Sequence, residues 1–189
     1  AHVFRLESPA GDGSRTACDL AGTWQLARHD ESQEVADRTG PLAAVPPAAA
    51  LHWSSIAVPG DRNVLRPELA FCHRYLYRTR IHVPESHRGR RLFLDFGECG
   101  TFTTVFVNGR RMGFSDDVLC GFQADVTDAV RFGQDNEVWV GIKDAYYAIE
   151  PTAERPDVRQ WFNTPLDLME QNQGVTNRFD YPVKGALAI

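Results

Sequence analysis

The sequence lacks the features that would place it in a membrane or on nucleic acid. No apolar run approaches the roughly 20 residues that a membrane-spanning helix needs. The 20 basic and 25 acidic residues are interspersed, give a formal net charge of −5, and form no long run of either sign. Nucleic acids and anionic membrane surfaces attract basic patches, so neither is expected as a partner.

Cysteine is also sparse, and its spacing excludes the usual zinc sites. Cys18, Cys72, Cys99 and Cys120 show neither close pairs nor the associated histidine spacing. Their even number permits two disulfides, but a chain of 189 residues can bury a core without them, so free buried thiols are an equal alternative. We therefore expect no metal ion and no other cofactor, and the cellular compartment stays open.

Helical periodicity is scarce, whereas short segments of alternating apolar and polar residues are frequent. Trp24 and Leu26 begin this pattern, and Asn108-Gly109 supplies a two-residue hairpin turn. The further strand segments are residues 53–58, 73–83, 90–96, 101–107, 111–114, 121–126 and 136–142. The sequence therefore predicts an all-β protein, an antiparallel β-sandwich or jelly roll, with a single helical turn starting at Thr127.

The pattern also divides the chain. We expect an N-terminal loop over residues 1–19, the β-sandwich over residues 20–144, and a long aromatic-containing loop over residues 145–189 that ends in the start of a final strand. Within the sandwich, Leu92, Leu94 and Phe96 should fill the core, and Val138, Val140 and Ile142 should share one face. Arg74, Arg78 and Arg80 should form a solvated sheet surface, or alternatively meet acidic residues of another domain.

An ordered set of segments gives the chain a family resemblance. "WSSIAVPGD", "YRTRIHVPE", "GRRLFLDFGECGTFTTVFVNGRRMGFSDD", "GFQADVTDAV" and "GQDNEVWVGIKD" together resemble the N-terminal β-sandwich domain of glycoside hydrolase family 2, which includes β-galactosidases, β-glucuronidases and β-mannosidases. The resemblance covers about residues 20–144. It implies a jelly roll of the galactose-binding-domain type in a retaining glycosidase, whose two catalytic glutamates lie on a separate (β/α)₈ barrel.

Such a barrel needs roughly 250 residues, so this chain does not contain it. The family places its acid/base glutamate after an asparagine. The Asn136-Glu137 pair of this chain lies at a turn before a sandwich strand, and we interpret it as a coincidence. No catalytic residue is expected here.

Three residues are candidates for contact with a carbohydrate substrate. The resemblance implies that Asp61 of "VPGD" reaches into the sugar pocket of the barrel, with Asn63 beside it; the alternative is a loop carboxylate that caps a local turn. Trp161 has the ring to stack on a sugar or to pack on the barrel, or else pins its own segment to the sandwich.

The sequence supports three hypotheses about the function. The first is a non-catalytic sugar-binding-type domain that braces the catalytic barrel and the following domain of the same polypeptide and shapes the sugar pocket. The second is an autonomous carbohydrate-binding module, and the third is a structural or oligomerisation domain. The jelly-roll fold alone does not separate them, because sites are grafted onto folds.

Overall fold

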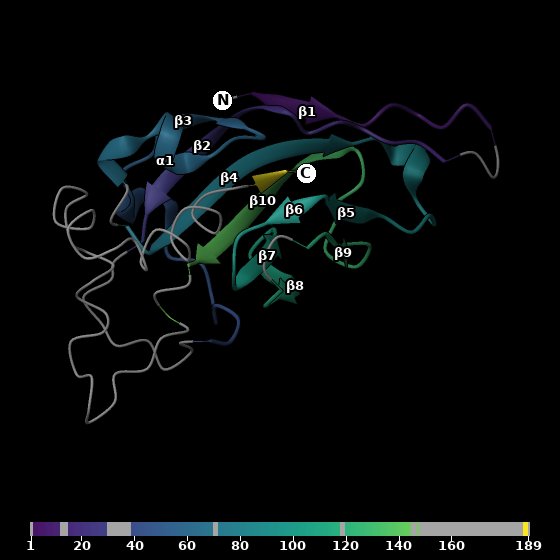
Figure 1. The fold of residues 1–189 in the computed structure, drawn as a ribbon. Coiled ribbons are helices and arrows are strands. Elements are labelled where there is room, and N and C mark those ends of the chain that lie inside the picture. The colour runs from purple at the N-terminus through teal and green to yellow at the C-terminus, as the bar shows by residue number, and fades with distance from the viewer. Residues whose placement is uncertain are drawn as a thin grey trace, which may run out of the picture.

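A seven-stranded sheet forms the larger layer of the fold (Figure 1). The computed structural model describes residues 2–11, 15–29, 39–69, 72–117, 120–144 and 147, and the backbone of residues 187–188. Six strands follow the order β3 (Ser54–Val58), β2 (Gly22–Arg28), β4 (Arg74–Val83), β10 (Gln134–Lys143), β7 (Thr103–Val107) and β8 (Arg110–Ser115), and neighbours are antiparallel. β1 (Val3–Arg5) joins β4 in parallel.

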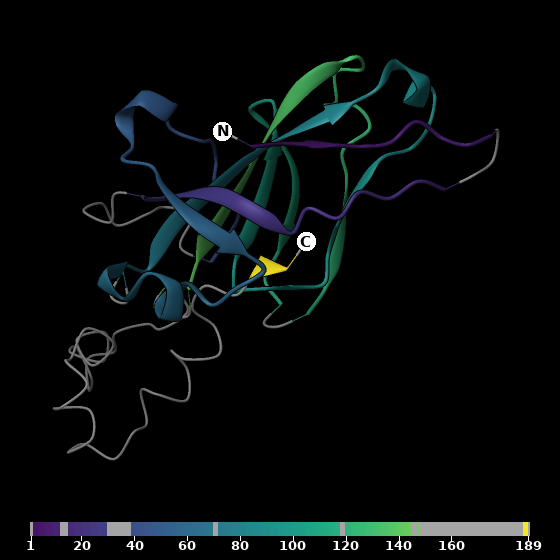
Figure 2. The ribbon, with the colours of Figure 1, turned by 90° about the horizontal axis from the view of Figure 1, so that it is seen from above.

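Two short two-stranded sheets form the second layer. β5 (Phe93–Phe96) pairs with β9 (Phe122–Asp125), and β6 (Glu98–Cys99) pairs with β11 (Leu187–Ala188). β11, the yellow arrow of Figure 2, lies beside β6, which Figure 1 labels. β11 lies where the start of a final strand was expected, and the division of the chain into domains stays a prediction.

The core lies between the two layers because alternate residues of each strand point inward. The long strands contribute Tyr75, Tyr77, Ile81, Val138, Val140 and Ile142, all buried. From the second layer come Leu94 and Phe96, with Leu92 partly buried against them. Phe96 stacks on Phe122 with ring centroids 4.7 Å apart. The predicted all-β sandwich and the predicted core residues are confirmed.

The outer face of the large sheet is covered as well. Leu42, Leu76, Phe106 and Trp139 form a second buried cluster, against which Val45, Ala48, Leu51 and Trp53 pack. The Ala- and Pro-rich stretch around the 3₁₀ turn Ala48–Ala50 thus covers the sheet. Gly141 permits this contact, because a Cβ there would lie 2.2 Å from Leu42 Cδ1.

This cover changes the interpretation of the arginines on β4. Arg74 is buried and its Nε donates to Nδ1 of His29 at 2.8 Å. The guanidinium of Arg78 lies 4.3 Å from the ring centroid of Trp53. Arg80 is exposed. The expected solvated arginine surface is therefore wrong for Arg74 and Arg78, because side chains from outside β4 cover them.

The turns follow the sequence closely. Asn108 and Gly109 both have positive φ, 51° and 81°, as a type I′ hairpin turn requires, and they join β7 to β8 as predicted. At Thr127 the chain makes one hydrogen-bonded turn, in which the amides of Ala129 and Val130 donate to the carbonyl of Val126. The α-helix of the described residues is instead α1 (Arg62–Leu65), followed by the 3₁₀ turn η2 (Pro67–Leu69); a further 3₁₀ turn, η3, spans Glu85–His87.

The structure also bears on the expected N-terminal loop, on the cysteines and on the C-terminal segment. Residues 1–19 were expected to be a loop, but they contain β1, whose three residues are too few to show alternation. None of the four cysteines forms a disulfide with another described residue, and Cys72 and Cys99 are buried. The long segment expected over residues 145–189 lies outside the described residues, apart from Tyr147 and the two residues of β11.

Candidate functional site

The candidate site is the corner formed by Asp61, α1 and η2 beyond the end of β3 (Figure 1). Asp61 is the N-cap of α1, and its Oδ1 accepts a hydrogen bond from the Asn63 amide at 2.8 Å. The backbone carbonyl of Asp61 accepts from the Leu65 amide at 3.0 Å. Asp61 therefore caps a local turn, which was one of the two alternatives that the sequence left open for it. Its second carboxylate oxygen accepts no hydrogen bond from the described residues.

Asn63 lies beside this carboxylate. Its backbone amide is used by the cap, whereas its side-chain Oδ1 is buried and has no partner among the described residues. A buried acceptor without a donor is costly, so such an atom calls for an explanation. The corner thus has one unmet acceptor next to an incompletely used carboxylate.

Arg62 is the most unusual residue of the corner, since its side chain is fully buried. Its guanidinium lies 4.3 Å from the ring centroid of Tyr75, and Nη1 donates to the carbonyl of Leu69. Nε and Nη2 have no partner among the described residues. Burial lowers the pKa of Arg62, but the electrostatic effect of Tyr75, Cys72, Tyr77 and Asp144 outweighs burial and raises it above the usual value. Arg62 therefore stays charged.

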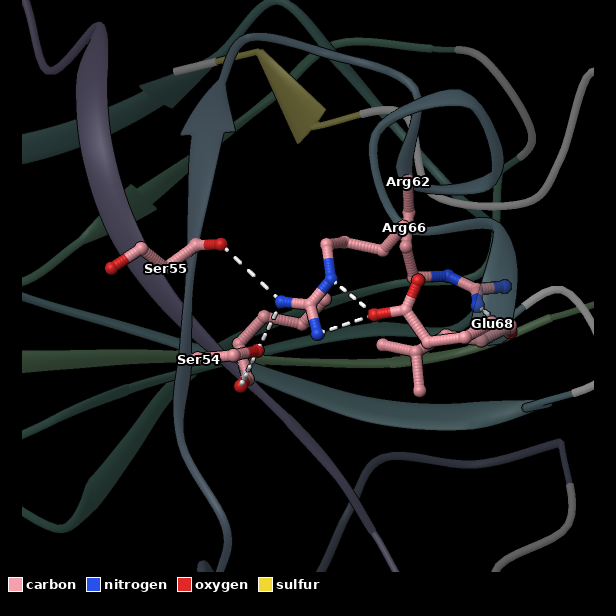
Figure 3. A network of polar contacts seen from close by, with 7 residues as sticks. Ser54, Ser55, Arg62, Arg66 and Glu68 are labelled. Carbon is pink, nitrogen blue, oxygen red and sulfur yellow. Dashed lines mark hydrogen bonds and ion pairs between the residues drawn. The ribbon is translucent and has the colours of Figure 1, made fainter.

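Arg66 ties the corner to the sheet, as Figure 3 shows. Its Nε donates to Oε1 of Glu68 at 2.5 Å, and Nη2 pairs with the same oxygen. Nη1 donates to Ser54 Oγ and to the carbonyl of Ser55, the latter at 3.3 Å. These contacts hold α1 against β3 and fix the direction in which Asp61 and Asn63 are presented.

The surface of the corner is apolar next to these polar groups. Val64 is 66% exposed and Leu65 is 43% exposed, although both belong to α1. Only one other large apolar side chain of the described residues, Phe93, is similarly exposed. Single exposed apolar residues are ordinary, but Val64 and Leu65 are adjacent and give the corner a small apolar surface beside its polar groups.

The same end of the sheet contains a buried ion pair. His73 Nδ1 lies 2.9 Å from Asp144 Oδ2, and both side chains are almost fully buried. Lys143, also buried, donates to the carbonyl of Gly40 at 2.7 Å. Burial withdraws the His73–Asp144 pair from any substrate, so we assign it to the structure of this end of the sandwich.

The structure brings two of the three predicted site residues together. Asp61 caps α1 and Asn63 lies in its first turn, whereas Trp161 lies outside the described residues. Glu137 pairs with Arg78 at 3.5 Å and Asn136 is buried among backbone partners, which agrees with a structural role for that dipeptide. Arg62 and Arg66 were not singled out from the sequence, because nothing in "DRNVLRPEL" distinguishes a buried arginine from a solvated one.

The described residues contain no cluster of three or more potential metal ligands. They also contain no helix that is long and apolar enough to span a membrane.

The fold and the corner define a β-sandwich domain of the galactose-binding type. Residues 50–180, more than half of the chain, match the family described as glycosyl hydrolase 2 galactose-binding domain-like. The chain belongs to this family.

Individual relatives agree with this assignment. A β-glucuronidase of Formosa agariphila is 25% identical over 68 residues, which is 36% of this chain and 7% of that protein. The fold is similar to that of the β-glucuronidase of Ruminococcus gnavus (TM-score 0.56, 23% identity, 72% of this chain and 22% of that one). It is also similar to the β-D-glucuronidase of Dictyoglomus thermophilum (TM-score 0.53, 20% identity, 67% and 19%). The matched region thus spans at most about a fifth of these relatives.

Proposed function

We propose that this chain is the non-catalytic N-terminal domain of a retaining β-glycoside hydrolase, which braces the catalytic barrel of the same polypeptide and shapes its sugar pocket. The names of the relatives favour a β-glucuronide as the substrate of the whole polypeptide. Residues 20–144 would form the sandwich, and residues 145–189 would lead to the following domain.

The observation that carries this proposal is the α1 corner. Val64 and Leu65 expose apolar surface that a neighbouring domain would cover. Asp61, between that surface and β3, keeps one carboxylate oxygen that accepts no hydrogen bond from the described residues, and Asn63 lies beside it with its Oδ1 buried. A sugar hydroxyl is a donor, so this oxygen of Asp61 suits a pocket wall that receives a pyranose.

A comparison of variants at Asp61 tests the proposal in a polypeptide that carries the barrel. Asp61→Ala removes both the cap and the free oxygen, whereas Asp61→Ser keeps a capping oxygen and removes the charged acceptor. Loss of a charged hydrogen bond costs about 1.5 to 3 kcal/mol, so both variants should lose roughly ten- to hundredfold in kcat/KM. Asp61→Ser should keep the melting temperature.

Asp19→Ala is the matched control, because Asp19 Oδ1 accepts from the Ala21 amide at 2.8 Å in the same two-residue geometry but at an exposed position. It should leave kcat/KM unchanged. If Asp61→Ser leaves kcat/KM unchanged, Asp61 is a capping residue and the pocket-wall role is wrong.

The 189-residue chain alone should hydrolyse no nitrophenyl β-glucuronide, β-galactoside or β-mannoside above a buffer blank.

A further inference from the structure

A polar basin lies on the outer face of the large sheet, at the end of β4 and β10 that is remote from α1. It has a volume of about 400 Å³ and is lined by Arg80, Asn108, Arg131, Asp135 and Glu137. This volume falls within the roughly 300 to 1,000 Å³ of small-molecule sites. The basin contains none of the residues of the α1 corner.

Strand register explains why these residues meet. Arg80 on β4 lies directly opposite Glu137 on β10, and His82 lies opposite Asp135. Residues opposite each other in an antiparallel pair point to the same face. The Asn108 amide donates to the carbonyl of Glu137 at 2.8 Å, which brings the β7–β8 turn to the rim of the basin.

A buried amide holds the remaining wall. Asn136 is 1% exposed; its Oδ1 accepts from the Arg131 amide at 2.6 Å, and its Nδ2 donates to the Arg131 carbonyl at 2.9 Å. The same Oδ1 accepts from Asn108 Nδ2 at 2.7 Å. The backbone of Arg131 is thus fixed on both sides by one side chain, and the basin is preorganised.

The hydrogen-bonding capacity left in the basin is mainly cationic. Asp135 is engaged by His82 at 2.8 Å, Glu137 by Arg78 at 3.5 Å, and both polar atoms of the Asn108 side chain bond within the wall. The side chains of Arg80 and Arg131 are exposed and make no hydrogen bond or ion pair with the described residues. Two of the lining residues are therefore arginines whose guanidinium groups have no partner among the described residues, and the two carboxylates beside them keep spare lone pairs.

We propose that this basin binds a uronic acid residue of a carbohydrate, with Arg80 and Arg131 holding the sugar carboxylate. Guanidinium groups match carboxylates in a fork geometry, and charge assistance strengthens each hydrogen bond. Asp135 and Glu137 accept hydrogen bonds from hydroxyl groups of the ring, and their basic partners offset their repulsion of the ligand. Among the described residues no aromatic ring lines the basin, so we expect binding to be weak and to depend on the two arginines.

The test is a calorimetric or NMR titration of the 189-residue chain with glucuronate, galacturonate, glucose and acetate. Both uronates should bind more tightly than glucose, which lacks the carboxylate, and than acetate, which lacks the ring hydroxyls. The affinity should fall as salt rises, because exposed charges are screened over about 10 Å at 0.1 M. The Arg80→Ala and Arg131→Ala variants should each weaken uronate binding roughly tenfold.

Arg88→Ala is the control, since Arg88 is an exposed arginine outside the basin that pairs with Glu85. It should bind uronates as the parent does, and circular dichroism should show all three variants folded. Equal binding of acetate and glucuronate, or equal loss in Arg88→Ala, would overturn the proposal, and so would the absence of uronate binding. The experiment needs no barrel, so its failure leaves the Asp61 kinetics as a separate question.

Discussion

Asn108 Nδ2 donates to Asn136 Oδ1 at 2.7 Å, and this side-chain bond joins the β7–β8 turn to the start of β10. Asn108 has two further bonds, from Nδ2 to the carbonyl of Ala129 and from the Glu137 amide to Oδ1. Four of the five lining residues of the basin, all but Arg80, belong to elements that this pair connects. The Asn108–Asn136 pair therefore holds the elements that line the basin in position.

Replacement of Asn136 by alanine should destabilise the chain. The change leaves the amide and carbonyl of Arg131 without their partner, and one unsatisfied buried group costs about 1 to 3 kcal/mol. Urea unfolding measures the loss. Gln134→Ala, on the same strand at an exposed position, should change the free energy of unfolding little. Equal stability of the two variants would show that water replaces the amide.

Gly141→Ala should destabilise the chain through Leu42. The new Cβ would lie 2.2 Å from Leu42 Cδ1, and overpacking of this kind costs about 1 to 3 kcal/mol. The matched background is Leu42→Ala, in which the clash is removed and the added methyl group should cost little. A double-mutant cycle by urea unfolding gives the coupling. If the two effects simply add, the packing of Leu42 on the outer face of the sheet does not require the missing side chain of Gly141.

Thiol reactivity should distinguish the exposed Cys120 from the buried Cys72 and Cys99. Cys120 is exposed, whereas burial raises the pKa of Cys99 to about 12, and Cys72 is also buried. The thiolate is the reactive form, so Cys120 should react first with a disulfide reagent at pH 8. Cys120→Ser should abolish the fast phase, and Cys99→Ser should leave it. A fast phase that survives Cys120→Ser would contradict this assignment.

Stability should fall below pH 4 partly because of Asp125. Its hydrogen bond from the Thr127 hydroxyl, then those from Arg91 and from the Thr127 amide, lower the pKa of the carboxyl to about 2. In the unfolded chain the pKa is about 3.9. The lowered pKa stabilises the fold above pH 4, and this contribution is lost as the pH falls towards 2.

Melting temperatures between pH 2 and 5 measure this effect. Asp125→Asn should show a shallower decline than the parent, whereas Asp128→Asn, an exposed carboxylate in the same turn, should follow the parent. Parallel declines of Asp125→Asn and the parent would show that the paired carboxylate does not contribute.

The strands were predictable because their information is local. Alternation in residues 73–83 and 90–96 identifies both the strand and its buried face, and Asn108-Gly109 specifies its own turn. The cover of the outer face was not predictable, because Leu42 and Trp53 contact the sheet through residues distant in sequence. For the same reason, the sequence predicted Arg74 as a surface residue, although it is buried.

The candidate site was predictable only as a position. "VPGD" indicated Asp61, and the structure adds that α1 follows it and that Arg62 is buried beneath. The basin was not predictable from the sequence, because the strand register, and not the sequence spacing, places Arg80 opposite Glu137.

Arg66 has a consequence for the solubility of the chain. β3 is the terminal strand of the large sheet, and such strands offer backbone groups to the strands of other molecules. The guanidinium of Arg66 donates to the carbonyl of Ser55 on β3, which places a charge on this strand and occupies one of its acceptors. The residue that orients the α1 corner therefore also discourages edge-to-edge aggregation of the domain.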